Sequence, residues 1–417
     1  MTLLISNIGC LVGLDTEGVE SLRGAEMSQI ETLNNAWLLV EDDRFAGWGS
    51  MDEPCEVEAT KVVDAKGGYL FPSFCDSHTH LVYAGSREGE YVDKINGLSY
   101  EQIAQRGGGI LNSADLLHAT TEEELYTQAM GRIDEIIAQG TGLVEIKSGY
   151  GLTTEDELKM LRVVRRIGET SPLAVRSTFL GAHAVGRAYA NRQVEYVDLI
   201  INEMIPAVAA DSLADFVDVF CDKGFFTLSE TERIVEAAAK HGMRPKIHAN
   251  ELANSGGVQL GVAHNALSVD HLERIEEPEI EALSTAETVA TLLPGAAIFL
   301  GIPYPPARRL IEAGAKVALA SDFNPGSSPM GSMRMIASLA TMTLRMTPTE
   351  AINATTINGA AAMGESNNYG SIGVGKVANF FITKPIPSLD YFTYAYTSPL
   401  IEKVFLNGTM IAGSCNK

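Results

Sequence analysis

Short apolar runs alternate with segments of helical character through the middle of the chain. Eight of these runs are typical of buried strands, and they span residues 70–77, 143–148, 174–181, 216–221, 246–249, 266–270, 288–293 and 317–321. Enough chain separates each run from the next to form a helix. The pattern therefore predicts an α/β fold of eight βα units, a (β/α)8 barrel of the TIM type. The first two runs are unusually far apart, so we expect residues 82–141 to cover one side of the barrel.

Two of the intervening helices carry N-terminal capping signals. Thr154 is followed three residues later by Glu157, and Ser229 is followed in the same way by Glu232. A hydroxyl and a carboxylate at this spacing can satisfy two free amide groups at a helix start. We therefore expect these two pairs to cap the helices that follow them.

Both ends of the chain predict strands without intervening helices. Residues 36–48 favour two strands around an acidic turn, and residues 377–406 contain two further β-rich runs. We expect the two ends to pair into a small β-sandwich domain, residues 1–65 plus 370–417. The barrel would then occupy residues 66–369.

Composition narrows the possible partners and location. The 417 residues are 46% hydrophobic and carry a formal charge of −22, which would repel nucleic acid and anionic membranes. The five cysteines include no closely spaced pair, which fits free thiols in a reducing compartment. The first ten residues lack the basic region of a signal peptide, and no apolar run reaches membrane-spanning length. We expect a cytoplasmic protein.

A His-x-His pair ends the first barrel strand. Residues two apart in a strand point to the same side, so His78 and His80 can offer two imidazole nitrogens to one metal ion. Alone, the pair is weak evidence, because two histidines at a strand edge need no function.

Later strand ends strengthen the case, since reactive groups of a (β/α)8 barrel come from the carboxyl ends of its strands. Five of the eight histidines stand at such ends, and acidic and other polar residues accompany them. The residues at these ends are His78, His80, Lys147, Tyr150, His183, His248, Glu251, His271, Asp322 and Asn324.

Three nitrogens and one oxygen make a plausible metal site. His78, His80, His248 and Asp322 would suit Zn²⁺ or Fe and leave room for a water. Such a metal lowers the pKa of its water from 15.7 to about 7, and Asp322 could also accept the released proton. The alternative interpretation of Asp322 is a helix N-cap.

Three more residues are candidates for chemistry beside the metal. Glu251 can take a proton from water and pass it to a leaving nitrogen, although it could be an exposed loop residue. His271 could stabilise an oxyanion, or it could be a satisfied core histidine. Arg87 suits a bidentate grip on a carboxylate, but alone it would fit an ordinary surface arginine.

Several motifs together resemble the amidohydrolase superfamily and, within it, the imidazolonepropionase family of histidine degradation. The motifs are Asp76-Ser77-His78-Thr79-His80-Leu81-Val82-Tyr83-Ala84-Gly85, Arg106-Gly107-Gly108-Gly109-Ile110-Leu111, Glu145-Ile146-Lys147-Ser148-Gly149-Tyr150-Gly151-Leu152, His248-Ala249-Asn250-Glu251 and Ser321-Asp322-Phe323-Asn324-Pro325-Gly326-Ser327. The resemblance covers nearly the whole chain. The His-x-His pair and the final Asp are common to the superfamily. The segments Lys147-Ser148-Gly149-Tyr150-Gly151 and Asp322-Phe323-Asn324-Pro325-Gly326-Ser327 are narrower and carry the substrate assignment.

The resemblance implies hydrolysis of the ring amide of 4-imidazolone-5-propanoate to N-formimidoyl-L-glutamate by a homodimer. It implies one Zn or Fe ion per chain, held by His78, His80, His248 and Asp322, since Cys221-Asp222 replaces the carboxylated lysine of dinuclear relatives at strand four. It implies that Glu251 transfers the proton and that His271 polarises the carbonyl. The implied substrate contacts are Arg87, Tyr100, Tyr150, His183, Glu251, Asn324, Gly326 and Ser327.

Two other functions compete with this one. A ring-amidine aminohydrolase, such as a guanine or cytosine deaminase, would share the metal, the glutamate and the strand-six histidine. Arg87 argues against it, because nucleobases carry no carboxylate. A non-catalytic barrel should have damaged ligand positions, whereas each position here is filled.

Overall fold

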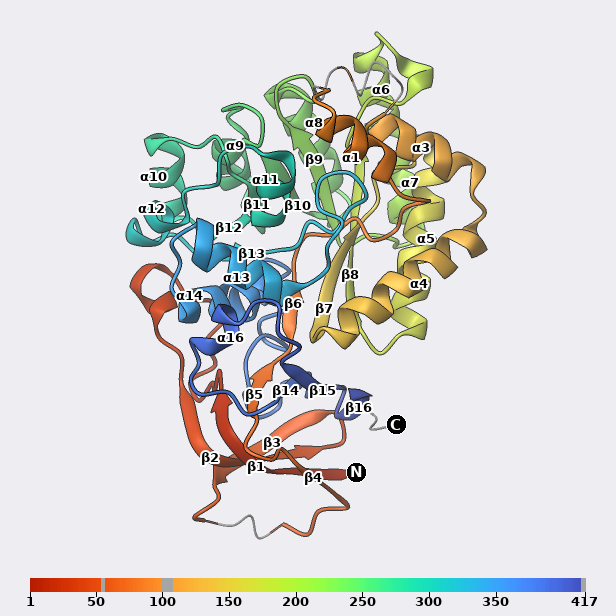
Figure 1. Cartoon of the computed structure of the whole chain (residues 1–417). Helices are drawn as coiled ribbons and strands as arrows, with labels where there is room; N and C mark the ends of the chain where they lie inside the picture. Colours follow the sequence, from red (N-terminus) through yellow and green to blue (C-terminus); the bar gives the residue numbers. More distant parts are fainter. Residues whose placement is uncertain (54–56, 99–101, 103–107, 414–417) are drawn as a thin grey trace.

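The structure is a computed structural model, and it describes residues 1–53, 57–98, 102 and 108–413. It consists of a parallel barrel with a β domain beneath it (Figure 1). The first and the last described residues lie on the β domain, away from the end of the barrel that carries helix α1 (Figure 1). In the described part of the chain, no helix combines the length and the apolar character that a membrane crossing needs.

Eight parallel strands form the barrel, in sequence order around the sheet, and this confirms the predicted fold class. They are β6 (Phe74–Asp76), β7 (Thr141–Lys147), β8 (Ala174–Ala182), β9 (Phe216–Cys221), β10 (Arg244–Ala249), β11 (Ser268–His271), β12 (Val289–Leu292) and β13 (Val317–Leu319). Nearly every residue of these strands is buried, because helices cover the outside and side chains fill the inside.

Helices fill the connections between the strands. Before β7 come α1 (Glu88–Ile95), α3 (Ile110–Ala119) and α4 (Glu122–Ala138). Between later strands lie α5 (Thr154–Thr170), η2 (Arg187–Tyr189), α6 (Gln193–Leu199), the π-helical η3 (Ile200–Met204), α7 (Ile205–Ala210), α8 (Leu228–Ala239), α9 (Gly257–Ala263), α10 (Glu277–Thr285), α11 (Pro294–Leu300) and α12 (Ala307–Glu312). After β13 follow α13 (Met333–Thr343), α14 (Pro348–Thr355) and α15 (Ile357–Ala361).

The two chain ends form one continuous mixed sheet, as the predicted fold class expects, while the domain bounds 1–65 plus 370–417 stay a prediction. Its strands are β1 (Thr2–Val12), β2 (Thr32–Glu41), β3 (Arg44–Ser50), β4 (Lys61–Asp64), β5 (Tyr69–Pro72), β14 (Phe380–Thr383), β15 (Ile401–Leu406) and β16 (Thr409–Gly413). Strand β5 joins the halves, because it pairs with β1 on one side and β14 on the other. Two short helices, η1 (Gly24–Ser28) and α16 (Tyr391–Tyr394), accompany the terminal segments.

Two local predictions were wrong. The apolar run 70–77 forms two strands, because the hydrogen-bonding partner of the backbone changes at Ser73. The N–H of Ser73 donates to Asn379 O, whereas the N–H of Phe74 donates to Gly140 O. The helices begin earlier than expected, with Thr153 capping α5 and Thr227 capping α8. The periodic pattern located the helices, but hydroxyls one or two residues upstream provide the caps.

The barrel closes just beyond the ends of β6 and β13. Thr79 forms a parallel bridge with Phe323, and the N–H of Asp322 donates to His78 O at 2.9 Å. Asp76 crosses the same seam, because its carboxylate accepts hydrogen bonds from the backbone and hydroxyl of Ser321. The seam therefore brings the His-x-His segment next to the segment that carries Asp322.

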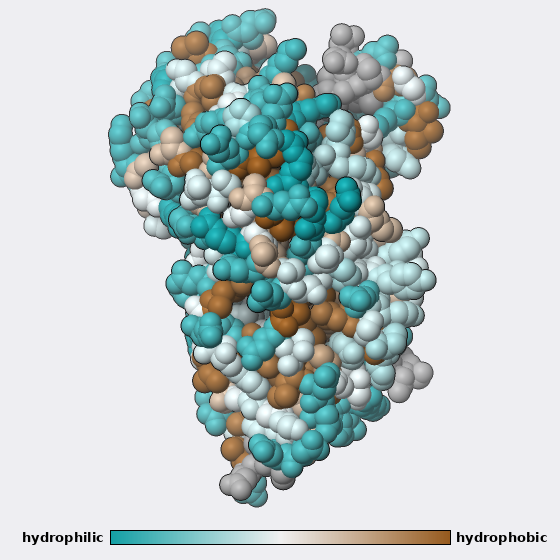
Figure 2. Space-filling view, turned by 90° about the vertical axis from the view of Figure 1, so that its left-hand side faces the viewer, coloured by the Kyte–Doolittle hydropathy of each residue, from teal (hydrophilic) through white to brown (hydrophobic). Residues whose placement is uncertain are grey.

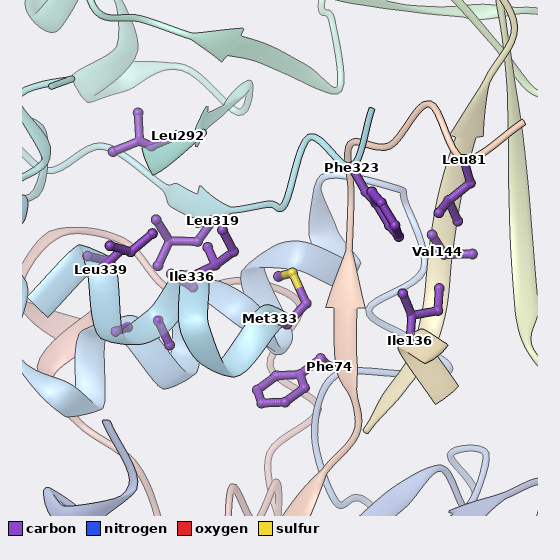
Figure 3. Packing of buried hydrophobic residues seen from close by; sticks show 14 of the residues in the cluster. Phe74, Leu81, Ile136, Val144, Leu292, Leu319, Phe323, Met333, Ile336 and Leu339 are labelled. Atoms are coloured by element: carbon purple, nitrogen blue, oxygen red, sulfur yellow. The ribbon is translucent and has the colours of Figure 1, made fainter. Parts of the chain in front are cut away.

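A buried apolar cluster supports this seam from below. Phe74, Leu319, Phe323 and Met333 belong to it and are all buried (Figure 3). Met333 comes from α13, so this helix packs against both the first and the last strand of the barrel. Close packing of this kind resists small displacements, which keeps the two sides of the seam in register.

We expect Asp76→Ala to weaken the seam. The substitution leaves the buried N–H and hydroxyl of Ser321 without an acceptor, which costs about 1–3 kcal/mol. Urea unfolding of the metal-free protein measures this change. Asp134→Ala on the exposed face of α4 is the control and should unfold like the unsubstituted protein. Equal stability of both variants would contradict a structural role for Asp76.

Candidate metal centre and active site

Four predicted ligands meet at the carboxyl ends of the barrel strands. Asp322 Oδ1 lies 3.5 Å from His80 Nε2 and 3.7 Å from His78 Nε2. The rings of His78 and His248 lie 4.4 Å apart between centroids. Potential ligand atoms form two groups, His78–His80–Asp322 and His78–His248–His271, and within each group they lie no more than 4.8 Å apart. His78 is shared, so the two groups describe one centre.

Aspartates behind two of these histidines fix their rings. His78 Nδ1 lies 2.6 Å from Asp270 Oδ2, and His248 Nδ1 lies 2.8 Å from Asp218 Oδ2. A carboxylate at Nδ1 keeps the proton there and leaves the lone pair of Nε2 for a metal. His248 is held twice, since its backbone N–H also donates to Asp218.

Beneath the aspartates lie two lysines and a third carboxylate, all completely buried. Lys147 Nζ is 2.7 Å from Glu145 and 2.8 Å from Asp218, and Lys246 Nζ is 2.7 Å from Glu145. Burial alone would lower the pKa of Lys147, but Asp218 and Glu145 raise it above its usual value. Burial would likewise raise the pKa of Asp218, yet His248 and Lys147 hold it well below its usual value. We call Glu145, Lys147, Asp218, Lys246 and Asp270 the buried ion cluster.

These residues fit a divalent metal. Burial lowers the pKa of His78 and of His80 far below the usual value, so both imidazoles are neutral, as metal binding requires. Among the described residues, none offers a hydrogen bond to the buried Nε2 of His78. Three imidazoles and a carboxylate are a donor set typical of Zn²⁺ or Fe.

The loop that carries Glu251 is held by Asp222, which follows β9. The carboxylate of Asp222 accepts the backbone N–H groups of Glu251, Leu252 and Ala253 at 2.8–3.0 Å. Glu251 is buried, and burial raises the pKa of its carboxyl to about 7. Its Oε2 lies 3.8 Å from Nε2 of His271.

His271 is the second titratable group of the site. Burial would lower its pKa, but the neighbouring carboxylates, Glu251 foremost, raise it to about 10. These carboxylates therefore favour the protonated form of the imidazole, which can donate a hydrogen bond into the site.

A cavity of about 360 Å³ opens above the predicted metal ligands. Its polar lining is His80, Arg87, Glu90, Lys94, Tyr150, His183, His248, Glu251, His271, Asp322, Asn324, Gly326 and Ser327. Apolar side chains form much of the remaining wall, among them Tyr91 of α1 and Phe299 of α11, whose rings stack at 5.4 Å. The cavity therefore suits a small molecule with polar groups at the metal end.

Arg87 lies inside this cavity with its side chain only 9% exposed. Its Nε and Nη2 contact Glu90 at 2.8 and 2.7 Å, and Glu90 also accepts the N–H of Gly109. The opposite edge of the guanidinium rests on Gly326, where an added Cβ would stand 2.1 Å from Nη1. A larger residue at position 326 would therefore displace the guanidinium of Arg87.

Asn324 organises the loop after Asp322. Its Oδ1 accepts the N–H groups of Gly326 and Ser327, and its Nδ2 donates to Asp322 O and Ser327 Oγ. Ser327 Oγ in turn lies 3.4 Å from Asp322 Oδ2. Both amide atoms of Asn324 therefore hold the loop in shape, a role that its sequence position alone did not indicate.

Glu157 holds the loop after β7 in shape. Its buried carboxylate accepts the N–H groups of Gly149, Gly151 and Leu152 at 2.8–3.0 Å. This holds Tyr150 near His183, with ring centroids 5.3 Å apart. The glutamate that we expected to cap α5 instead shapes the site.

Sequence comparison places the chain in a family. The chain is 51% identical to imidazolonepropionase of Christiangramia forsetii over 411 residues, 99% of this chain and all of that one. Identity and coverage are the same for imidazolonepropionase of Flavobacterium johnsoniae. The amidohydrolase family model matches residues 69–411. The chain belongs to the imidazolonepropionase family of amidohydrolases.

Solved structures share the fold at low identity. A triazine hydrolase variant has a TM-score of 0.77 at 15% identity and covers 99% of this chain and 95% of its own. An adenosine deaminase from Xanthomonas campestris with bound zinc has a TM-score of 0.73 at 17% identity, with 98% and 92% covered. These likenesses show the fold alone.

The predicted site residues line one cavity, apart from two. His78 lies buried beside His80 and His248, and Tyr100 lies outside the described residues. Sequence reasoning missed the supporting residues Asp218, Asp270, Asp222 and Glu157. A signal existed for the first two, since each is a lone acid within an apolar strand, where an unpaired charge is costly.

We expect Asp218→Asn to weaken metal binding by about 10- to 100-fold, because the ring of His248 loses the carboxylate that orients it. Competition with a chromogenic chelator measures the affinity. Asp211→Asn, at an exposed position after α7, should bind metal as the unsubstituted protein does. An unchanged affinity in Asp218→Asn would exclude this orienting role.

Proposed function

We propose that the chain hydrolyses the ring amide of 4-imidazolone-5-propanoate to N-formimidoyl-L-glutamate, a step of histidine degradation. Identity of 51% over nearly the full length to enzymes named imidazolonepropionase carries this proposal. The site supports it, since potential metal ligands, the proton acceptor Glu251 and the arginine Arg87 all line the cavity.

One metal ion per chain, Zn²⁺ or Fe, would be held by His78, His80, His248 and Asp322. Such an ion supplies Lewis acidity, which lowers the pKa of water and polarises a carbonyl. A single ion fits the end of β9, where Asp222 is occupied by backbone N–H groups and Lys223 is exposed. Elemental analysis of the purified protein distinguishes zinc from iron.

Glu251 carries the proton in this scheme. With a pKa of about 7, its carboxylate can accept a proton from the attacking water and then donate it to the ring nitrogen that leaves. Asp322 lies in the same lining and is a second possible acceptor. The backbone clamp from Asp222 keeps Glu251 in place during both transfers.

His271 would stabilise the charge that develops on the amide oxygen. Its protonated ring can donate a hydrogen bond to that oxygen, and this donation strengthens as negative charge builds up. A buried donor of this kind acts in a site with little water, where electrostatic interactions are strong.

Arg87 would hold the propionate arm. Its guanidinium lies in the cavity wall against Gly326. Tyr150, His183, Asn324, Gly326 and Ser327 line the space for the ring. Tyr100 stays a proposed contact.

The decisive experiment follows the ultraviolet absorbance of the imidazolone ring. We expect absorbance to fall with metal-loaded protein and to stay constant after chelation. Readdition of metal should restore the reaction. A constant absorbance with loaded protein would contradict the proposal, and release of ammonia from guanine or cytosine would favour a ring-amidine aminohydrolase.

We expect Glu251→Gln to retain its metal but to lower kcat at least ~10²-fold, because glutamine cannot transfer the proton. Single-substrate kinetics at measured metal content test this. Glu236→Gln, exposed on α8, is the matched control. Near-normal turnover of Glu251→Gln would remove the residue from its role.

Arg87→Ala should mainly raise KM, by about 10- to 100-fold, since a charged hydrogen bond to the carboxylate is lost. Steady-state kinetics separate KM from kcat. The exposed Arg192→Ala is the control. Unchanged kinetics of Arg87→Ala would reject the carboxylate grip.

We further propose that the protein acts in the cytoplasm as a homodimer. The formal charge of −22 disfavours anionic membrane surfaces. On the face shown in Figure 2, hydrophilic residues dominate much of the surface, and hydrophobic residues gather in patches nearer the middle. Sedimentation equilibrium distinguishes a dimer from a monomer.

A further inference from the structure

Glu273 is a buried carboxylate that the proposed mechanism does not use. Its side chain has no exposed surface, and within the described residues neither carboxylate oxygen has a hydrogen-bond partner. Burying a charged group without partners costs several kcal/mol, so such groups need an explanation. Its nearest basic neighbour provides one.

That neighbour is His271. Glu273 Oε2 lies 3.7 Å from Nδ1 of His271, and this nitrogen is also buried and without another partner in the described structure. The other ring nitrogen, Nε2, faces Glu251 at 3.8 Å. The imidazole therefore stands between a carboxylate of the cavity lining and one that does not line the cavity.

An unusual backbone conformation places the ring of His271 between these two carboxylates. His271 and Leu272 both have positive φ, 84° and 70°, at the end of β11. This region is rare for residues with a side chain, because it is sterically strained. Hydrogen bonds from Leu272 N to Ala249 O and from Arg274 N to Asn250 O hold the bend against the segment that carries Glu251.

We propose that Glu273 is a positioning residue that accepts the Nδ1–H of His271 and so directs Nε2 of this ring at the substrate carbonyl. The proposal rests on the proposed function for its kinetic consequences only. Without the carboxylate, the buried ring can turn about its side-chain bonds, and misplacement by about 1 Å can cost 10²-fold in rate.

Glu273→Leu tests the proposal, because leucine suits a buried site but accepts no hydrogen bond. We expect its metal content to be unchanged and its kcat for the imidazolone to fall about 10- to 100-fold, with KM nearly constant. Glu273→Gln keeps an acceptor oxygen and should recover most of the rate. Glu281→Leu, exposed on α10, is the control.

A spectroscopic measurement separates this idea from the proposed function. In protein labelled with ¹⁵N-histidine, the ring signals of His271 are assigned by their loss in His271→Asn. We expect Glu273→Leu to shift the Nδ1 signal of His271, and this readout needs no substrate. If the unsubstituted protein leaves the imidazolone intact, the proposed function fails while the Nδ1 shift still tests the contact.

Two results would overturn the proposal. One is an unchanged Nδ1 signal in Glu273→Leu. The other is an unchanged kcat per bound metal in a variant that loses only thermal stability, since this would leave Glu273 a purely structural role. If Glu273→Leu does not fold, Glu273→Asp replaces it, because the shorter side chain moves the acceptor away from Nδ1 of His271. We then expect the kcat of Glu273→Asp to fall while Glu273→Gln keeps most of the rate.

Discussion

The site depends on one electrostatic arrangement, the pairing of two buried lysines with three buried carboxylates under the predicted metal ligands. Lys147 contacts Glu145 and Asp218, and Asp218 in turn holds the ring of His248. Removing either side of such a pairing leaves an uncompensated charge in a medium of low polarity. The residues of the buried ion cluster come from strands β7, β9, β10 and β11. The barrel core therefore fixes the orientation of the predicted ligands.

Much of this could be predicted from the sequence. The eight apolar runs located the barrel strands, since buried parallel strands are apolar over their whole length. His78, His80, His248 and Asp322 each follow or end such a run, and a barrel gathers its strand ends at one mouth. The ends of the predicted strands were therefore enough to locate the candidate site residues in the sequence.

The supporting residues could not be predicted in the same way. Asp218 serves His248 because β9 and β10 are neighbours in a particular register, with His248 beside Phe220, and no sequence pattern gives that register. Asp222 and Glu157 act on loops whose N–H groups point inward only after the chain has turned. The split of residues 70–77 was hidden for a similar reason, since both halves are buried in different sheets.

The contact between Arg87 and Gly326 has a consequence for how these two positions can vary. The guanidinium occupies the space that any side chain at position 326 would need. A side chain at position 326 would therefore have to displace the guanidinium, and with it the ion pair between Arg87 and Glu90. Substitutions at positions 87 and 326 should thus depend on each other, so that a larger residue at 326 is tolerated better once the arginine is gone.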